Sequence, residues 1–391
     1  PALFGHGEVG RSWEFNFHSV KKGLNQMDDW LKRFVPPEIL SRKSYTPGFQ
    51  PKSEGNLVKL NTNENPYPPS PLVANAVLEE TKRLHYYPEP TSAKLRKLIA
   101  QKHQVEQSQV IIGNGSDDLL NLCVRAFSDS KRSVGMLNPS YSLYPTLTSL
   151  QRSSLSLIEF SDDQFDLPLE KIISSGVNLF FLTNPHAPTG LSFPRAEMAK
   201  ILNDLEAILV VDEAYADFAE DTSIPLLFEA DNLIVTRTFS KSYSLAGSRV
   251  GYAVSSPQII EVLDNVREVY NLDRMSQAAA QAALSDKSYF EDCKAKILNE
   301  RQKAHTFFTS LGWRTVESQA NFIFTEPVTR GGKVGKEVAK SLFKYLESQN
   351  VFVRYFSNHR LTESKIRISI GTKDQMITLI QTIKNWLNEN S

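Results

Sequence analysis

Hydrophobic residues recur along this chain in two alternating patterns. From about residue 72, short runs rich in β-branched residues, bounded by turn residues, alternate with longer segments in which hydrophobic residues recur at helical spacing. This alternation predicts a mostly parallel sheet covered by helices. Several runs are hydrophobic at every position, which favours strands buried on both faces. The predicted strands are residues 110–112, 133–137, 179–183, 208–211, 233–236 and 251–254.

The pattern changes on either side of this region. Six prolines between residues 40 and 71 exclude helix interiors and central strands there, so an irregular arm is expected. After about residue 272, long helical segments dominate and predict a smaller α+β domain. We therefore expect an N-terminal arm and extension (1–71), a large domain (72–272) and a small C-terminal domain (273–391). In the last, the predicted helices are 276–284, 294–311, 334–349 and 373–387, and the predicted strands are 320–324, 351–355 and 365–370.

Composition narrows the possible partners. The 391 residues carry 44 basic and 44 acidic side chains, so no net charge draws the protein to nucleic acid or an anionic membrane, and small-molecule partners are expected. The longest hydrophobic runs are too short to cross a bilayer and the N-terminus has no hydrophobic signal core, which predicts a soluble cytoplasmic protein. Cys123 and Cys293 lie far from any partner at metal-ligand spacing, so free thiols and no metal site are expected.

The first segment that carries candidate chemistry runs from a strand through a glycine turn into a helix, at residues 110–127. Ser116 has the character of an N-cap, and Asp117 lies in the first turn. A helix N-terminus that follows Gly113 and Gly115 offers backbone N–H groups and a positive dipole end, which suit a phosphate. An ordinary capped helix after a tight turn explains this segment on its own at least as well.

The second segment is a hydrophobic strand that ends in a carboxylate, at residues 207–215. At the carboxyl end of a parallel strand, the side chain of Asp212 would enter the ligand crevice. Glu213 would point the other way and have a structural role, and Tyr215 follows three residues after Asp212. The segment alone is equally compatible with Asp212 capping a following helix.

The third segment places Lys241 among small hydroxyl residues, between two hydrophobic runs, at residues 236–252. A lysine held in this way can be desolvated and deprotonated, which an imine-forming nucleophile requires. Ser240 and Arg249 could complete a phosphate site with the Gly115–Ser116 turn, the arginine through paired N–H donors.

In their order, these segments resemble the class I and II aminotransferases and, within them, the histidinol-phosphate aminotransferase group. The resemblance covers about residues 59–372 and implies an α/β fold of the pyridoxal-phosphate (PLP) transferase fold type I, with PLP bound by the large domain. Each motif is weak alone, and the ordered set is specific. The matching segments are KLNTNENP (59–66), YPE (87–89), GNGSD (113–117), NPSY (138–141), APTG (187–190), DEAY (212–215), SK (240–241) with Arg249, and RISIGT (367–372).

The resemblance also implies roles for individual residues. Lys241 would carry PLP as a Schiff base and then move a proton at the substrate Cα. Asp212 would pair with the pyridinium nitrogen, and Tyr215 would hydrogen-bond the phenolic oxygen of the ring. Tyr141 would stack on the ring. The phosphate would be held by Gly115, Ser116, Asp117, Ser240 and Arg249.

Further positions concern the substrates and a second subunit. The resemblance assigns Arg367 to a substrate carboxylate and Arg354 to a distal phosphate, and Asn63 is placed with them in substrate binding. Tyr87 would reach the cofactor phosphate of a neighbouring subunit, which implies a homodimer with shared active sites.

Two positions depart from the pattern of the family. Ala187 stands where an asparagine usually contacts the oxygen of the ring, and Gly48 is smaller than the aromatic residue that some relatives place near the substrate. The adjacent His186 could compensate for the lost asparagine, although a structural role is the simpler expectation for a single histidine.

The resemblance implies transamination between histidinol phosphate and 2-oxoglutarate. The alternative is another PLP reaction on the same fold: an aromatic or arginine-like aminotransferase, a decarboxylase, an eliminase or a cyclase. A binding protein without catalysis ranks lower, because Lys241, Asp212, Tyr215 and Arg249 are all present. A nucleotide-binding Rossmann protein is excluded, because no Gly-x-Gly-x-x-Gly follows the first strand.

Overall fold

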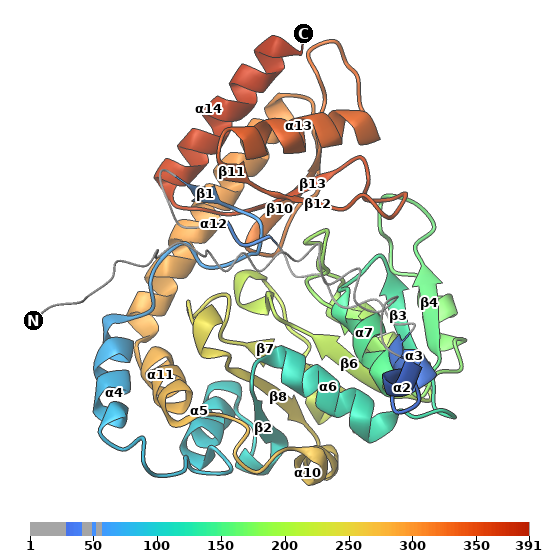
Figure 1. The fold of residues 1–391 in the computed structure, drawn as a ribbon, viewed down its shortest axis with the longest axis vertical. Coiled ribbons are helices and arrows are strands. Elements are labelled where there is room, and N and C mark those ends of the chain that lie inside the picture. The colour runs from blue at the N-terminus through green and yellow to red at the C-terminus, as the bar shows by residue number, and fades with distance from the viewer. Residues whose placement is uncertain (1–28, 41–48, 52–56, 391) are drawn as a thin grey trace, which may run out of the picture. The chain divides into compact units, whose positions relative to one another are not determined.

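A computed structural model describes residues 29–40, 49–51 and 57–390 (Figure 1). The chain divides into two units, residues 1–44 and residues 45–391. The described part of the first unit holds two short helices, α2 (Asp29–Lys32) and α3 (Pro37–Leu40). All later observations concern the second unit.

The centre of the second unit is a seven-stranded sheet with the order β2-β8-β7-β6-β5-β3-β4. Strands β3 to β7 pair in parallel, and β8 runs antiparallel to both β7 and β2. The predicted strands are confirmed to within two residues at each end. The bounds are β2 (Val110–Gly113), β3 (Val134–Asn138), β4 (Leu155–Glu159), β5 (Leu179–Thr183), β6 (Ile208–Asp212), β7 (Leu233–Thr238) and β8 (Gly251–Ser255).

Helices cover both faces of this sheet, as the continuous hydrophobic strands predict. In β6, Leu209 and Val211 pack into one hydrophobic cluster and Val210 into another, so the strand is buried on both sides. Helices α6, α7 and α10 contribute to the cluster that contains Val210, and α5, α8, α9 and α11 to the other. The bounds are α4 (Pro71–Thr81), α5 (Ala93–His103), α6 (Ser116–Phe127), α7 (Leu143–Leu150), α8 (Leu169–Ile173), α9 (Arg195–Asp204), α10 (Pro257–Val266) and α11 (Arg274–Ser285), with short 3-10 helices η2 (Gln107–Gln109), η3 (Ala216–Phe218), η4 (Ile224–Phe228) and η5 (Ala246–Ser248).

The C-terminal part has its own antiparallel sheet, with the order β12-β13-β10-β9. Three helices pack around it and share a separate hydrophobic cluster that includes Phe308, Trp313 and Trp386. The four helices predicted after residue 272 are confirmed as α11 to α14. The bounds are α12 (Lys287–Ser310), β9 (Arg314–Thr315), β10 (Phe322–Glu326), α13 (Lys336–Ser348), β11 (Val351–Phe352), β12 (Arg354–Tyr355), β13 (Ile366–Ser369) and α14 (Lys373–Glu389).

Two expectations are corrected here. The single strand predicted at 351–355 is two strands, because β11 pairs with β1 (Val58–Lys59) while β12 pairs with β13. The predicted irregular arm therefore contains a short strand, which lies between Pro51 and Pro66 where proline does not interrupt the backbone. The predicted boundaries at residues 71 and 272 stay predictions. Among the residues that the structure describes, no helix is both long and hydrophobic enough to span a bilayer.

Candidate active site

Asp212 ends β6 at the carboxyl edge of the parallel strands, as predicted, and is 3% exposed. Its Oδ2 accepts a hydrogen bond from the Tyr144 hydroxyl at 2.9 Å, and its Oδ1 accepts the backbone N–H of Ala214 at 3.2 Å. Burial raises the pKa of Asp212 to about 6. Asp212 does not cap a helix, because the N-cap of the following η3 is Tyr215. A buried carboxylate at this edge suits a cationic group of a ligand.

Tyr144 is a site residue that the sequence analysis missed. Its ring is fully buried and stacks on Phe181 with 4.6 Å between ring centres, and its hydroxyl also lies 2.7 Å from Thr183 Oγ1. The position three residues after Tyr141, within helix α7, was the signal available in the sequence. The hydroxyl of Tyr144 therefore orients the carboxylate of Asp212.

Lys241 lies in the loop after β7, where the buried residues Phe239 and Tyr243 hold the backbone on both sides. Its Nζ donates a hydrogen bond to the backbone oxygen of Thr62 at 3.2 Å and lies 5.8 Å from the centre of the Tyr215 ring. The side chain is half-buried. The sequence prediction that Lys241 is held against the protein is confirmed.

The predicted phosphate-binding residues converge on the N-terminus of α6. Arg249 donates from Nη1 to Ser240 Oγ at 3.3 Å and from Nη2 to Asp117 Oδ2 at 3.0 Å. Gly115 has a positive φ of 85°, and a Cβ there would lie 2.6 Å from Arg249 Nη2. The absence of side chains at Gly115 and at Gly251 thus lets Arg249 and β8 approach the helix.

The predicted N-cap at this helix is wrong by one residue. Gly115 is the N-cap, and Ser116 is the first residue of α6. A glycine at this position carries no side chain that could compete for the first N–H groups of the helix, which is compatible with an external anion. Tyr141 joins the same group, because its hydroxyl donates to Asp117 Oδ1 at 3.0 Å.

Tyr215 is buried beside residues from the arm and from the C-terminal sheet. The Nδ2 of Asn63 donates to the Tyr215 hydroxyl at 3.0 Å, and the ring meets Phe322 edge-on at 5.1 Å between centres. Asn63, predicted to bind substrate, therefore contacts the predicted cofactor ligand Tyr215.

The two predicted substrate arginines lie beside each other on adjacent strands of the C-terminal sheet. Arg354 on β12 pairs in register with Arg367 on β13, and both guanidinium groups lie over the ring of Phe356, at 5.5 Å and 5.2 Å. Arg367 also donates from Nη2 to the backbone oxygen of Asn61 at 3.4 Å. Two cations held so close together favour a ligand with more than one negative charge.

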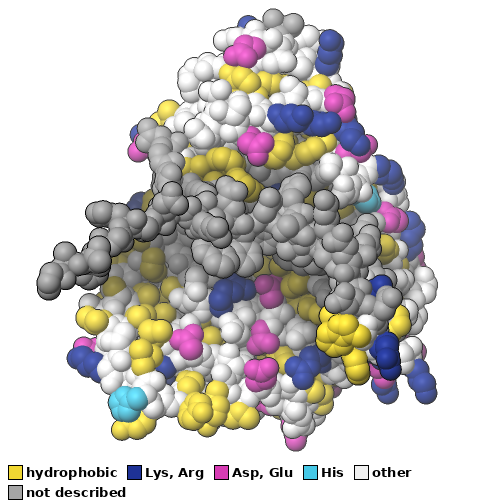
Figure 2. All heavy atoms as spheres, in the orientation of Figure 1, with side chains coloured by type: hydrophobic (Ala, Val, Ile, Leu, Met, Phe, Trp, Pro, Cys, Tyr) yellow, Lys and Arg dark blue, Asp and Glu magenta, His cyan; other side chains and the backbone are white. Residues whose placement is uncertain are grey.

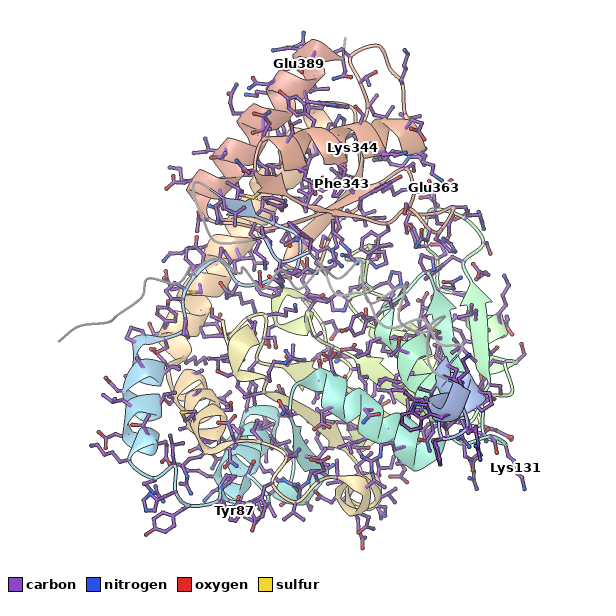
Figure 3. All side chains as sticks on the ribbon, in the orientation of Figure 1. Tyr87, Lys131, Phe343, Lys344, Glu363 and Glu389 are labelled. Carbon is purple, nitrogen blue, oxygen red and sulfur yellow. The ribbon has the colours of Figure 1, made fainter. Side chains whose placement is uncertain are left out.

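Tyr87 does not lie near the other predicted site residues of the same chain. The side chain is 76% exposed and stacks on Tyr270 with 4.5 Å between ring centres. Figure 3 shows it pointing outward at the edge of the large domain, far from the C-terminal sheet.

The structure separates the roles of Ala187 and His186. Ala187 packs in a small hydrophobic cluster with Tyr215, Ala320 and Phe322 and offers no side-chain donor. His186 is fully buried, with Nε2 2.9 Å from the carbonyl oxygen of Pro139 and Nδ1 2.8 Å from Thr189 Oγ1. Because a carbonyl only accepts, the proton lies on Nε2. Both nitrogens are used, so His186 has the structural role expected of it; Gly48 lies outside the described residues.

Burial also makes His186 sensitive to acid, because it lowers the pKa of this histidine to about 4. The folded protein resists a proton that the unfolded chain accepts near pH 6.5, so the free energy of unfolding falls between pH 6.5 and 4, by about 3 kcal/mol from this group. His186→Asn, which cannot titrate, should lose less stability over that range in urea unfolding at several pH values. The exposed His85→Asn is the control, and parallel pH profiles for wild type and His186→Asn would contradict the expectation.

Behind the site lies a buried ion cluster that the sequence analysis recognised only at Glu213. Arg237 donates from Nη2 to Glu213 Oε2 at 2.7 Å and from Nη1 to Asp217 Oδ1 at 3.0 Å. Ser242, next to Lys241, donates to Asp217 Oδ2. Burial alone would raise the pKa of Asp217, but the charges of Lys102 and Arg237 lower it to about 2. The cluster thus joins the segment after β6, the short helix η3, β7 and the Lys241 loop.

The fold and this convergence of residues define a class of protein. The family model Aminotransferase class I and II matches residues 55–383, and the chain belongs to this family. Among curated relatives, the histidinol-phosphate aminotransferase of Citrifermentans bemidjiense is 40% identical over 347 residues, which cover 88% of this chain and 96% of that protein.

Solved structures agree with this assignment. The histidinol-phosphate aminotransferase of Sinorhizobium meliloti, in complex with pyridoxal-5'-phosphate, has a TM-score of 0.78 and 26% identity, over 85% of this chain and 92% of that chain. The L-threonine-O-3-phosphate decarboxylase of Porphyromonas gingivalis shares the fold, with a TM-score of 0.71 and 22% identity over 85% of this chain and 100% of that chain. The predicted family and fold are therefore confirmed.

Proposed function

We propose that this aminotransferase uses PLP, held on Lys241, to transfer the amino group of histidinol phosphate to 2-oxoglutarate. The observation that carries the proposal is that Lys241, Asp212, Tyr215 and Arg249 all lie at one edge of the sheet. At this edge β6 and β7 end and the antiparallel β8 begins, and Lys241 Nζ lies 5.8 Å from the centre of the Tyr215 ring. The curated relative at 40% identity, itself named a histidinol-phosphate aminotransferase, supports the choice of substrate.

The residues present fit the cofactor. Two glycines let Arg249 and β8 approach the N-terminus of α6, where a guanidinium and backbone N–H groups suit a phosphate, and the buried carboxylate of Asp212 suits a protonated ring nitrogen. When bound, PLP supplies a carbonyl that links to amines and a ring that takes up electrons from the substrate Cα. The phosphate would be held by Gly115, Ser116, Asp117, Ser240 and Arg249, which meet at the N-terminus of α6.

The other site residues would orient the ring of the cofactor and move the proton at the substrate. Asp212 would keep the proton on the ring nitrogen, and Tyr215 would donate to the phenolic oxygen of the ring. Tyr141 would lie against the face of the ring. Lys241 Nζ would move the proton at the substrate Cα.

Charge at the C-terminal sheet supports the substrate assignment. Arg354 and Arg367 together match the distal phosphate of histidinol phosphate and, in the second half-reaction, the two carboxylates of 2-oxoglutarate. Each half-reaction brings two negative charges to the same pair of guanidinium groups.

The assembly proposed is a homodimer with shared active sites. Hydrophobic side chains are exposed around Tyr87, and Figure 2 shows such side chains along the lower edge of the molecule, over and below α4. Burial of this surface by a second copy would bring Tyr87 to the neighbouring phosphate site. The exposed residues are Leu78, Leu84, Tyr86, Tyr87, Val269 and Tyr270. The cytoplasmic location stays a prediction from the sequence.

Adding histidinol phosphate alone to PLP-loaded protein is expected to convert the visible absorption band to the ultraviolet band of the pyridoxamine form, because the half-reaction needs no acceptor. Later addition of 2-oxoglutarate should restore the first band and release glutamate. Aromatic and arginine-like amino acids, added separately, are the controls. An unchanged spectrum with histidinol phosphate and a full response to another amine would reject this substrate.

A second candidate keeps the fold and changes the reaction to decarboxylation, elimination or cyclisation. Ala187 favours it, because the usual donor beside the ring oxygen is missing. The fold does not decide between them, since the P. gingivalis decarboxylase shares it. A product that retains its nitrogen, formed while no keto acid is consumed, would identify this alternative.

A further inference from the structure

Ala187 supplies no side-chain hydrogen-bond donor beside the predicted position of the cofactor's phenolic oxygen. Its methyl group packs against Tyr215 and Phe322, so this position donates no hydrogen bond from its side chain. His186 does not replace the missing amide, because both ring nitrogens bind elsewhere. Any compensation therefore has to act through Tyr215 or its neighbours.

Asn63 is the neighbour whose geometry fits this need. Its side chain is 1% exposed, and its Nδ2 donates to the Tyr215 hydroxyl at 3.0 Å. Ser369 Oγ accepts the backbone N–H of Asn63 and donates to Asn63 Oδ1, both at 2.9 Å. The Nδ2 of Asn321 donates to the backbone oxygen of Asn63 at 3.0 Å. Every polar group of Asn63 is thus bound, and its amide cannot rotate freely.

The backbone of Asn63 indicates that this arrangement is specific. Its φ is 56°, in the left-handed region that asparagine and glycine adopt more readily than other residues. The residues that hold Asn63 by hydrogen bonds are Ser369, on β13, and Asn321, which immediately precedes β10. The arm residue is therefore fixed by the C-terminal sheet while it contacts a side chain of the large domain.

This contact determines the direction in which Tyr215 donates. Its hydroxyl oxygen accepts from Asn63, so its own hydrogen points away from Asn63, and Lys241 Nζ lies over the same ring, 5.8 Å from its centre. Successive hydrogen bonds polarise one another, so a hydroxyl that accepts from an amide is a stronger donor. Asn63 thus acts on the Tyr215 hydroxyl as its donor.

We propose that Asn63 is a positioning residue that orients and strengthens the Tyr215 hydroxyl as a donor to the phenolic oxygen of the bound cofactor, replacing at one remove the donor lost at Ala187. The inference rests on the proposed function, because it requires PLP linked to Lys241. A stronger donor withdraws negative charge from the phenolic oxygen, which weakens that oxygen's hold on the proton at Lys241 Nζ.

The test is the pH midpoint at which the visible band of PLP-loaded protein gives way to its ultraviolet band. Asn63→Gly removes the amide and still allows the positive φ. Its midpoint is expected to rise by about half a unit to one unit, the size of one hydrogen bond. Asn61→Gly, a buried asparagine of the same arm whose Nδ2 donates to the backbone of Phe49, is the matched control and should leave the midpoint unchanged.

Two further variants separate positioning from a general structural role. Ala187→Asn restores a direct donor, so it should lower the midpoint and, combined with Asn63→Gly, return it towards that of wild type. In a Tyr215→Phe background, Asn63→Gly should cause no further shift, because the hydroxyl through which it acts is gone. If Asn63→Gly does not fold, Asn63→Asp keeps the shape and the tolerated φ, replaces the donor by an acceptor, and should raise the midpoint further.

The outcomes distinguish this inference from the proposed function. A wild-type protein that titrates and responds to histidinol phosphate, with an unchanged midpoint in Asn63→Gly, overturns the role of Asn63 alone. An equal shift of the midpoint in the Tyr215→Phe background also overturns it, because Asn63 then acts by another route. A wild-type protein that forms no visible band with PLP overturns both.

Discussion

Lys241→Ala is expected to abolish transamination, with a loss of at least about a thousand-fold in turnover, because one amine both links the cofactor and moves the proton at the substrate Cα. The variant should still bind PLP, since Arg249, Ser240 and the N-terminus of α6 do not depend on Lys241. Turnover is measured with histidinol phosphate and 2-oxoglutarate, and retention of PLP by gel filtration.

The pattern of losses identifies what Lys241 does. Arg249→Ala should show the opposite result, with weaker PLP retention and partial turnover once PLP is in excess, because it removes paired donors to the phosphate. The exposed Lys171→Ala is the control for loss of a lysine and should behave as wild type. Full turnover by Lys241→Ala would refute its assignment, whatever the variant binds.

The strands that could be predicted best from the sequence are those that are buried on both faces. Residues 179–183 are hydrophobic at every position, and β5 has the same bounds, because a central strand is buried on both faces. Strand β4 was missed because it lies at the edge of the sheet, with residues that are only half-buried or exposed. The division at residue 353 depends on which distant strands pair with each half, and periodicity along one segment carries no such information.

The same distinction applies to the site. Asp212, Lys241 and Arg249 could be predicted because each follows or precedes a recognisable strand in a motif of the family. The hydrogen bond from Tyr144 to Asp212 joins residues 68 apart, and the one from Asn63 to Tyr215 joins residues 152 apart. The sequence predicts a substrate role for Asn63 from its motif and carries no sign of its contact with Tyr215.

The second large effect is expected from Arg237→Met, in the ion cluster behind the site. Arg237 is 5% exposed and Glu213 1% exposed, and Arg237 binds both Glu213 and Asp217. Removing the cation takes away the guanidinium partner of Glu213 and one of the cations beside Asp217, where Lys102 remains, and this should lower the free energy of unfolding by about 3–5 kcal/mol at pH 8. Urea unfolding at pH 8 and at pH 5 is the measurement.

The pH dependence reveals the cause of that loss. In wild type the pKa of Asp217 is lowered to about 2, so its contribution to stability is complete above pH 3.8 and is lost as the pH falls towards 2. Between pH 8 and 5 it is constant. In Arg237→Met, protonation of a carboxylate relieves the repulsion, so the deficit relative to wild type should shrink at pH 5.

Adding Glu213→Gln should recover part of the stability at pH 8, because one uncompensated charge is removed. The exposed pair Arg195–Asp221 is the control, and Arg195→Met should cost less than about 1 kcal/mol. A deficit in Arg237→Met that is equal at both pH values would attribute the loss to packing and not to charge. Ser242, the neighbour of Lys241, donates to Asp217. Arg237→Met should therefore also lower turnover at urea concentrations at which the variant is still folded.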